Sequence, residues 1–141
     1  MNVLIDTPIW SLALRRQSRQ LNAAERHLVD EWVELVKEGQ AYLIGPIRQE
    51  LLSGVRRPLV FTRLRDHLSA FADVPLMTTD YEQTADFFNQ CRTKGITGTP
   101  VDLLICARAA RLRLAIFTTD NDFERYARYL PIHIHASRFR S

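Results

Sequence analysis

The stretch VLIDTPIW, residues 3–10, contains a short apolar run, an acid and a proline in immediate succession. The run at residues 3–5 is purely apolar and rich in β-branched side chains, which predicts a strand buried on both faces of a parallel sheet. Pro8 suits the first turn of a helix, which we expect to reach about residue 16. Asp6 therefore falls where a buried strand ends, the edge at which open α/β sheets bind their ligands.

The same alternation of apolar runs and helix-like stretches continues along the chain. Further strands are expected at residues 41–44, 114–118 and 132–134, and a short extended piece at 74–76. Helices are expected at residues 22–38, 45–54, 58–72, 80–95, 100–113 and 121–128. This pattern predicts one α/β domain over residues 1–141, with a parallel sheet covered by helices on both faces.

Composition and charge narrow the class of protein. The chain has 141 residues, of which 46% are hydrophobic and 25% charged, as in ordinary soluble globular domains rather than disordered chains. The formal net charge is +3, and only Lys37 and Lys94 among the 19 basic residues are lysines. Arginine presents a planar fork of donors that suits phosphate oxygens, so an anionic partner such as nucleic acid is permitted but not required.

Cysteine usage and the N-terminus indicate a cytoplasmic protein. Cys91 and Cys106 lie in apolar, helix-like stretches without metal-type spacing, which predicts buried free thiols in a reducing compartment. The chain begins without a basic segment followed by an apolar one, so no signal peptide is expected. No apolar run approaches the length of a membrane span, and we expect no membrane partner.

Four acids are expected to converge at one edge of the sheet. Asp6 and Asp120 each follow a predicted strand, Asp102 lies in the first turn of the helix before the later strand, and Glu50 lies on the helix after the second strand. Carboxylates held close together repel one another unless a cation neutralises them. A hard divalent cation such as Mg²⁺ or Mn²⁺ prefers such oxygen ligands and can activate water for phosphodiester hydrolysis.

Each acid also has a purely structural interpretation. Asp6 and Asp120 could cap the helices that follow them, and Asp122 could favour a helix dipole. Thr99 and Asp102 have the spacing of a capping box, so the two interpretations of Asp102 are evenly balanced. A helical glutamate such as Glu50 is most often a solvated surface residue. The two histidines of the last strand, His133 and His135, have no third ligand nearby, which argues against a zinc site.

Four segments together resemble PIN-domain nucleases, and most closely the VapC toxins of bacterial type II toxin–antitoxin pairs. They are residues 3–10 with Asp6, residues 45–54 with Glu50, residues 100–109 with Asp102, and residues 116–123 with Asp120 and the accessory Asp122. The resemblance covers essentially the whole chain. Pro8, Cys106 and Arg113 depart from the usual family residues without removing an acid.

The resemblance implies a PIN-like three-layer α/β/α sandwich with a mostly five-stranded parallel sheet. It also implies a Mg²⁺- or Mn²⁺-dependent endoribonuclease that acts on RNA, forms a homodimer and is inhibited by a VapB-like antitoxin. Asp6, Asp102 and Asp120 would bind metal, with Glu50 as a further catalytic acid; Asp122, Thr7, Thr118 and Arg48 would be accessory. Arg15, Arg48 or Arg108 could bind phosphate at the rim.

Three further interpretations follow from these assignments. An antitoxin groove is expected around Trp10, Leu51 and Leu52. A non-catalytic module that binds nucleic acid or protein on a PIN fold is an alternative, although a phosphate binder gains nothing from a pocket of uncompensated acids. A housekeeping PIN nuclease that processes RNA would share the chemistry, and the short single-domain length favours the toxin.

Overall fold

A four-stranded parallel sheet forms the centre of the protein, which we describe from a computed structural model for residues 1–139. The strands are β1 (Val3–Ile5), β2 (Ala41–Tyr42), β3 (Ala115–Phe117) and β4 (His133–Ile134), in the spatial order β2-β1-β3-β4. β1 and β3 are buried throughout, in keeping with their apolar sequences. The strand expected from residues 3–5 is therefore confirmed as a central strand.

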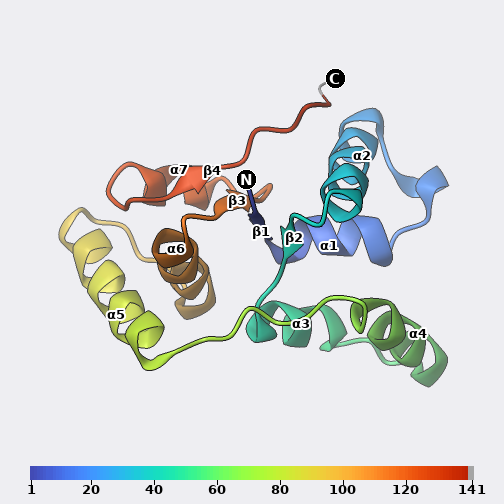
Figure 1. The fold of residues 1–141 in the computed structure, drawn as a ribbon, viewed down its shortest axis with the longest axis horizontal. Helices are drawn as coiled ribbons and strands as arrows, with labels where there is room; N and C mark the ends of the chain where they lie inside the picture. Colours follow the sequence, from blue (N-terminus) through green and yellow to red (C-terminus); the bar gives the residue numbers. More distant parts are fainter. Residues whose placement is uncertain (140–141) are drawn as a thin grey trace.

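Helices cover both sides of this sheet. Figure 1 shows α1 and α2 on one side, with α5 and α6 on the other. In chain order the helices are α1 (Thr7–Leu14), the 3₁₀ helix η1 (Ser18–Gln20), α2 (Ala23–Lys37), α3 (Gly45–Leu52), α4 (Pro58–Leu68), α5 (Thr78–Thr93), α6 (Pro100–Leu112) and α7 (Asp122–Ala127). The expected layered α/β architecture is thus confirmed. Within residues 1–139, every helix is too short or too polar to cross a membrane.

The strand order reverses at β1, and this reversal places the candidate site. From β1 the chain crosses to β2 on one side, and β3 later pairs with β1 on the other, with Leu4 opposite Ile116 and Ile5 opposite Phe117. The amide of Asp6 donates to the carbonyl of Phe117 at 2.9 Å, which extends this pairing by one residue. Asp6 and the segment after Phe117 therefore share the carboxyl edge of the sheet at the switch point.

The sheet has four strands rather than the five implied by the family resemblance. The extended segment after α4 contributes a single parallel bridge, between Leu43 and Asp73, and the amide of Val74 donates to the carbonyl of Leu43 at 2.9 Å. Pro75 follows at once and has no N–H to continue the ladder. The fifth strand is therefore reduced to one bridge beside β2.

An aromatic cluster fills the space between α1, α2 and the end of α4. Trp10 packs edge-on against Trp32 and Phe71, at ring centroid distances of 5.6 and 4.8 Å, and its indole N–H donates to the carbonyl of Ile5. Trp10 and Leu51 are both fully buried. These two side chains therefore belong to the core and cannot themselves line a groove, whereas the expected antitoxin groove along their helices stays a prediction.

Local helix signals are confirmed in some places and corrected in others. The capping box at the start of α2 is present, with Asn22 and Glu25 exchanging side-chain to backbone hydrogen bonds of 2.8 and 3.0 Å. α5 begins at Thr78 rather than at the expected residue 80, so Asp80 lies inside its first turn, where it accepts from the amide of Met77 at 2.8 Å. Cys91 and Cys106 are free and buried, as expected.

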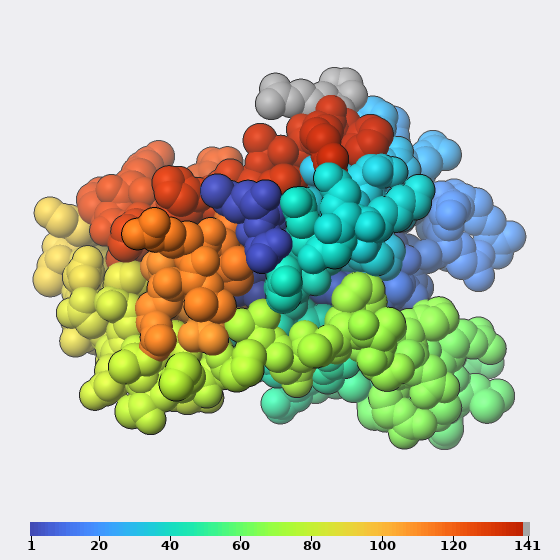
Figure 2. Space-filling model, in the orientation of Figure 1, coloured from blue at the N-terminus to red at the C-terminus, as the bar shows by residue number. Residues whose placement is uncertain are grey.

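The first strand is buried between its neighbours. Figure 2 shows the dark-blue N-terminus between the cyan segment around β2 and the orange segment that contains α6 and β3. All three residues of β1 are fully buried. The rigid centre of the sheet therefore carries the acid that follows β1.

Candidate metal centre

Asp6 is a nearly buried carboxylate at the end of β1, with only 5% of its surface exposed. One oxygen accepts from the amide of Thr7 at 2.8 Å, and the other accepts from the hydroxyl of Thr118 at 2.8 Å. Burial raises the pKa of Asp6, and the charges of Glu50 and Asp120 raise it further, whereas these hydrogen bonds oppose the rise. Asp6 thus caps α1, as expected if its role is structural. It also lies close to other acids, as expected if it belongs to a metal site.

Thr118 connects two of the predicted acids. Its hydroxyl donates to Asp6 and accepts from the amide of Asp120 at 3.0 Å. One oxygen of Asp120 in turn accepts from the amide of Asp122 at 2.9 Å. The loop after β3 is therefore held by a chain of hydrogen bonds that leads from Asp6 to Asp122.

Asp102 lies at the start of α6, and its carboxylate is not used for capping. Thr99 caps the helix by accepting from the Asp102 amide at 3.1 Å, but no reciprocal bond from the Asp102 side chain forms. Instead Oδ2 of Asp102 accepts from the hydroxyl of Tyr126 at 3.2 Å. This geometry favours a functional interpretation of Asp102 over the structural one that the spacing allowed equally.

The electrostatics of Asp102 indicate a crowded acidic site. Partial burial raises its pKa to about 6, and repulsion by Asp6 and Asp120 adds to this effect, while hydrogen bonds from Tyr126 and Thr99 oppose it. A carboxylate in such surroundings is neutralised by protonation or by a cation. The raised pKa therefore reflects burial first and the neighbouring negative charges second, and a bound cation would favour the ionised carboxylate against both.

Three of the predicted acids form a tight group. Asp102, Asp120 and Asp122 each place a carboxylate oxygen within 4.8 Å of the other two. Asp102 lies at the start of α6, whereas Asp120 and Asp122 lie just before and at the start of α7, so the fold brings Asp102 to the other two. The donor set consists of oxygens only, which suits a hard divalent cation rather than zinc or copper.

Asp6, Glu50 and Thr7 surround this group. The negative charge of Asp6 repels those of Asp102 and Asp120. Both oxygens of Asp6 also accept hydrogen bonds from threonines. Glu50 is exposed on the last turn of α3, and its charge contributes to the raised pKa of Asp6. The hydroxyl of Thr7 is buried and has no hydrogen-bond partner among residues 1–139. An unpaired hydroxyl next to Asp6 fits a site that accepts a further ligand or water.

The arginines expected to bind phosphate differ in their surroundings. The guanidinium of Arg48 donates to Asp73 and to the carbonyls of Leu68 and Phe71, so all three of its nitrogens are used within the protein. Arg108 is 6% exposed and pairs with the buried Asp80 at 3.1 Å, and a buried side chain cannot contact substrate at the rim. Only Arg15 is exposed, as the expected role requires.

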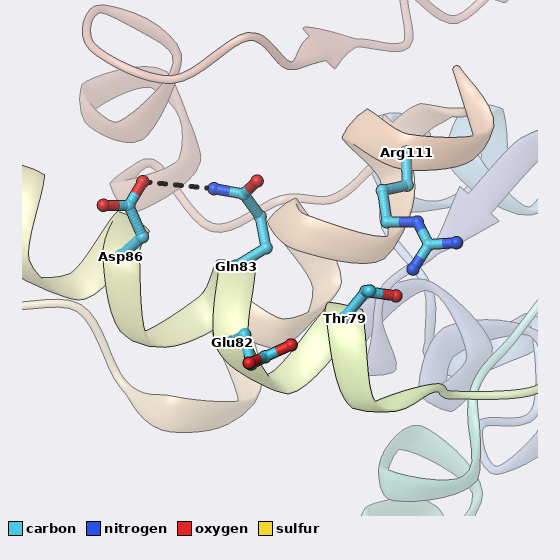
Figure 3. A pocket seen from close by; sticks show the side chains of 5 residues that line it. All are labelled: Thr79, Glu82, Gln83, Asp86 and Arg111. Carbon is cyan, nitrogen blue, oxygen red and sulfur yellow. Dashed lines mark hydrogen bonds between the residues drawn. The ribbon is translucent and has the colours of Figure 1, made fainter.

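A surface pocket of about 440 Å³ lies away from these acids, between α5 and α6. Figure 3 shows Gln83 bonded to Asp86 on α5, with Arg111 of α6 on the opposite side. Arg111 also pairs with the buried Asp80 at 3.5 Å. Because Gln83, Asp86 and Arg111 already have partners within the protein, this pocket does not compete with the acidic group as a candidate active site.

Tyr126 is the functional candidate that the sequence does not reveal. It is 1% exposed on α7 and packs edge-on against Phe123, so its spacing reads as that of a core aromatic. Only its hydroxyl, which reaches Asp102 across 24 residues of sequence, connects it to the site. A Tyr in place of Phe at a core position is the sole sequence signal, because a buried hydroxyl needs a partner.

The fold and the acidic edge define a class of protein, and comparison with known families identifies it. The model of the PIN domain matches residues 3–129, and the chain therefore belongs to the PIN-domain family. No curated protein matches the sequence.

Solved structures from bacteria are similar in fold. FitAcB from Neisseria gonorrhoeae is 21% identical over 95% of this chain and 96% of that one, with a TM-score of 0.75. VapBC2 from Rickettsia felis, bound to a DNA fragment from their promoter, is 15% identical over 96% and 98%, with a TM-score of 0.74. A toxin–antitoxin complex from Klebsiella pneumoniae is 19% identical over 86% and 90%, with a TM-score of 0.63.

Proposed function

We propose that the protein is a metal-dependent endoribonuclease and the toxin of a type II toxin–antitoxin pair. The observation that carries the proposal is the group formed by Asp102, Asp120 and Asp122, whose carboxylate oxygens lie within 4.8 Å of one another at the carboxyl edge of a PIN-domain sheet. Carboxylates at this spacing repel one another, and a shared cation relieves that repulsion. Resemblance to toxin–antitoxin complexes supports the toxin assignment.

Asp102, Asp120 and Asp122 would hold Mg²⁺ or Mn²⁺, together with Asp6. When bound, such an ion supplies a water of lowered pKa and stabilises charge on a phosphoryl oxygen. Asp6 orients Thr118 and thereby the loop that carries Asp120. Glu50, which is exposed beside Asp6, is the acid free to accept a proton from water or to contact a second ion.

The same resemblance supports the proposed partners. RNA is the proposed substrate, a VapB-like antitoxin the proposed inhibitor and a homodimer the proposed assembly, in the cytoplasm. The antitoxin cannot dock on Trp10 or Leu51, because both are fully buried. Leu52, which is partly buried on the last turn of α3, remains available for such a contact.

The decisive experiment is cleavage of a structured RNA with Mn²⁺ or Mg²⁺ by the wild type, by Asp102→Asn and by Asp86→Asn. Asp86 is an exposed acid on α5 and serves as the matched control for loss of one negative charge. We expect cleavage by the wild type and by Asp86→Asn, and none by Asp102→Asn or in EDTA. Activity that survives Asp102→Asn would refute the assigned site.

Failure of well-folded wild-type protein to cut a broad set of RNAs with either metal would contradict the endoribonuclease proposal. RNA or antitoxin binding that is indifferent to EDTA would then favour a non-catalytic binding module. Isothermal titration with Mn²⁺ then tests the metal site apart from catalysis, because the tight acidic group should bind the ion even where no RNA is cut.

A further inference from the structure

A groove of about 460 Å³ lies between the end of α1 and one face of α4. Arg15 and Arg16 border it on the α1 side, and Arg57 and Arg63 border it on the α4 side. Figure 2 shows these two segments, blue and green, one above the other at the right of that face. The remaining lining residues are Leu14, Gln17, Val60, Leu64 and His67.

The groove concentrates positive charge without internal compensation. No carboxylate lines it, and all four arginines are exposed. Within residues 1–139, Arg15, Arg57 and Arg63 form no ion pair, and Arg16 reaches only Glu25, at 3.8 Å. Like charges gathered in one concave surface attract polyanions, and the attraction is strongest where the walls focus the field.

The groove is connected to the acidic site by α1 itself. Thr7, the first residue of α1, directly follows Asp6, and Leu14, its last residue, lines the groove. Eight helical residues span about 12 Å. A strand whose scissile phosphate lies at the acids would therefore meet the arginines a few nucleotides away.

We infer that this groove binds the phosphate backbone of the RNA that the acidic site cuts. The inference rests on the proposed function for the identity of the polyanion. Arginine forks match phosphate oxygens in two-point contacts, and the apolar floor at Leu14 and Leu64 offers a surface for sugars or bases. The arginines thereby supply the affinity that the repulsive acidic site does not.

The test compares two double variants of equal net charge. Arg57→Gln/Arg63→Gln removes two groove cations, and Arg92→Gln/Arg128→Gln removes two exposed cations on α5 and after α7. Binding of a labelled single-stranded RNA of about 15 nucleotides is followed by fluorescence anisotropy in EDTA, where no cleavage is expected. The salt concentration is varied between about 50 and 200 mM.

We expect the groove variant to bind RNA at least about 5-fold more weakly, with the slope of log affinity against log salt reduced by about 1.4, since each single-strand contact contributes about 0.7. In the metal-dependent cleavage assay it should raise KM and leave kcat unchanged. Equal weakening in both variants would show an effect of net charge only and would overturn the inference.

Two further results would also overturn it. Unchanged RNA binding with loss of binding to a polyglutamate peptide would assign the groove to an acidic polypeptide. Unchanged RNA binding with loss of self-association, measured by light scattering, would assign it to a second copy of the chain. If the wild type binds RNA through the groove but cuts none, the groove stands and the proposed nuclease activity fails.

Discussion

The phenolic hydroxyl of Tyr126 lies 3.2 Å from Oδ2 of Asp102, so a core residue of α7 orients an acid at the start of α6. The hydroxyl donates to this oxygen, and the Asp102 carboxylate also offers an oxygen to the group that it forms with Asp120 and Asp122. Polar partners of metal ligands fix ligand orientation and tune ligand basicity.

Tyr126→Phe should therefore weaken Mn²⁺ binding by about 10-fold, the lower end of what such partners contribute. Loss of the donor also raises the pKa of Asp102 above about 6, so the defect should be larger at pH 6 than at pH 8. Isothermal titration at both pH values measures this. Tyr129→Phe, which removes a hydroxyl from an exposed tyrosine, is the control and should bind like wild type. If Tyr126→Phe and Tyr129→Phe bind Mn²⁺ equally well, the role of Tyr126 is limited to packing in the core.

The raised pKa of Asp102 also predicts how stability depends on pH. A carboxyl whose folded pKa is raised binds more protons when folded, so in EDTA the free energy of unfolding should fall as pH rises through about 6. Asp102→Asn should remove part of that fall. Because the site is partly solvated, we expect Asp102→Asn to raise the free energy of unfolding by about 1 kcal/mol at pH 8 and Tm by about 3 °C.

Saturating Mn²⁺ should reverse the order of the two proteins. The wild type gains stability from a ligand that binds only the folded state, whereas Asp102→Asn loses most of that gain. Thermal unfolding in EDTA and in Mn²⁺, each at pH 5 and pH 8, compares the wild type with Asp102→Asn under four conditions. A variant less stable than wild type in EDTA at every pH would mean that Asp102 stabilises the fold through Tyr126 and that its repulsion is minor.

Signals local in sequence predict much of the fold and part of the site. The apolar run before Asp6 and the proline after it mark a strand end and a helix start, which is why its place at the sheet edge is predictable. Asp120 lies near Asp6 only because β1 and β3 are neighbours in the sheet. The sequence alone does not show that these two strands pair. The apolar pattern of the sequence also does not predict that each strand forms ladder pairs over only two or three residues.

Long-range polar contacts account for what the sequence does not reveal. The partners of Arg48 lie 20 to 25 residues further along the chain, and two of them are backbone carbonyls that no residue type signals. Tyr126 likewise resembles any core aromatic until its hydroxyl meets Asp102. Helical periodicity predicts which face is buried, but it does not predict which buried group receives a polar partner.

Arg48 should behave as a structural residue. Arg48→Ala removes bonds to Asp73 and to two carbonyls at the end of α4, so we expect a loss of about 2 kcal/mol in urea unfolding. Its KM for RNA should stay within about 2-fold of wild type, since its donors are already used within the protein. Arg15→Ala should show the opposite pattern, with little change in stability. A large rise in KM for Arg48→Ala at unchanged stability would restore the phosphate-binding role.

Glu31 should hold the C-terminal segment against α2. It is fully buried and bonds to His135 at 2.8 Å and to Arg138 at 3.0 Å, which hold its pKa below the usual 4.5 despite burial. A lowered folded pKa stabilises the protein above about 4.5, and that contribution is lost as pH falls further.

Glu31→Gln should therefore cost about 2 kcal/mol at pH 7, with the deficit shrinking as pH falls below 4.5. Glu34→Gln is the matched control, because it breaks only a surface pair with Lys37 at 3.6 Å and should change stability by less than about 0.5 kcal/mol. Urea unfolding at pH 7 and at acid pH measures both. A deficit that is independent of pH would point to lost packing rather than lost charge.

Arg113 ends α6 in the left-handed conformation, with φ of 55°, a backbone region that favours glycine. A side chain in this region costs about 1–2 kcal/mol relative to glycine. Arg113→Gly should therefore stabilise the protein by about 1 kcal/mol and raise Tm by about 3 °C. Ala85→Gly, in the exposed interior of α5, should instead lose about 1 kcal/mol. If both glycines destabilise to the same extent, the Arg113 side chain, which lines a surface pocket together with Met1 and Pro131, stabilises the fold by more than its conformation costs.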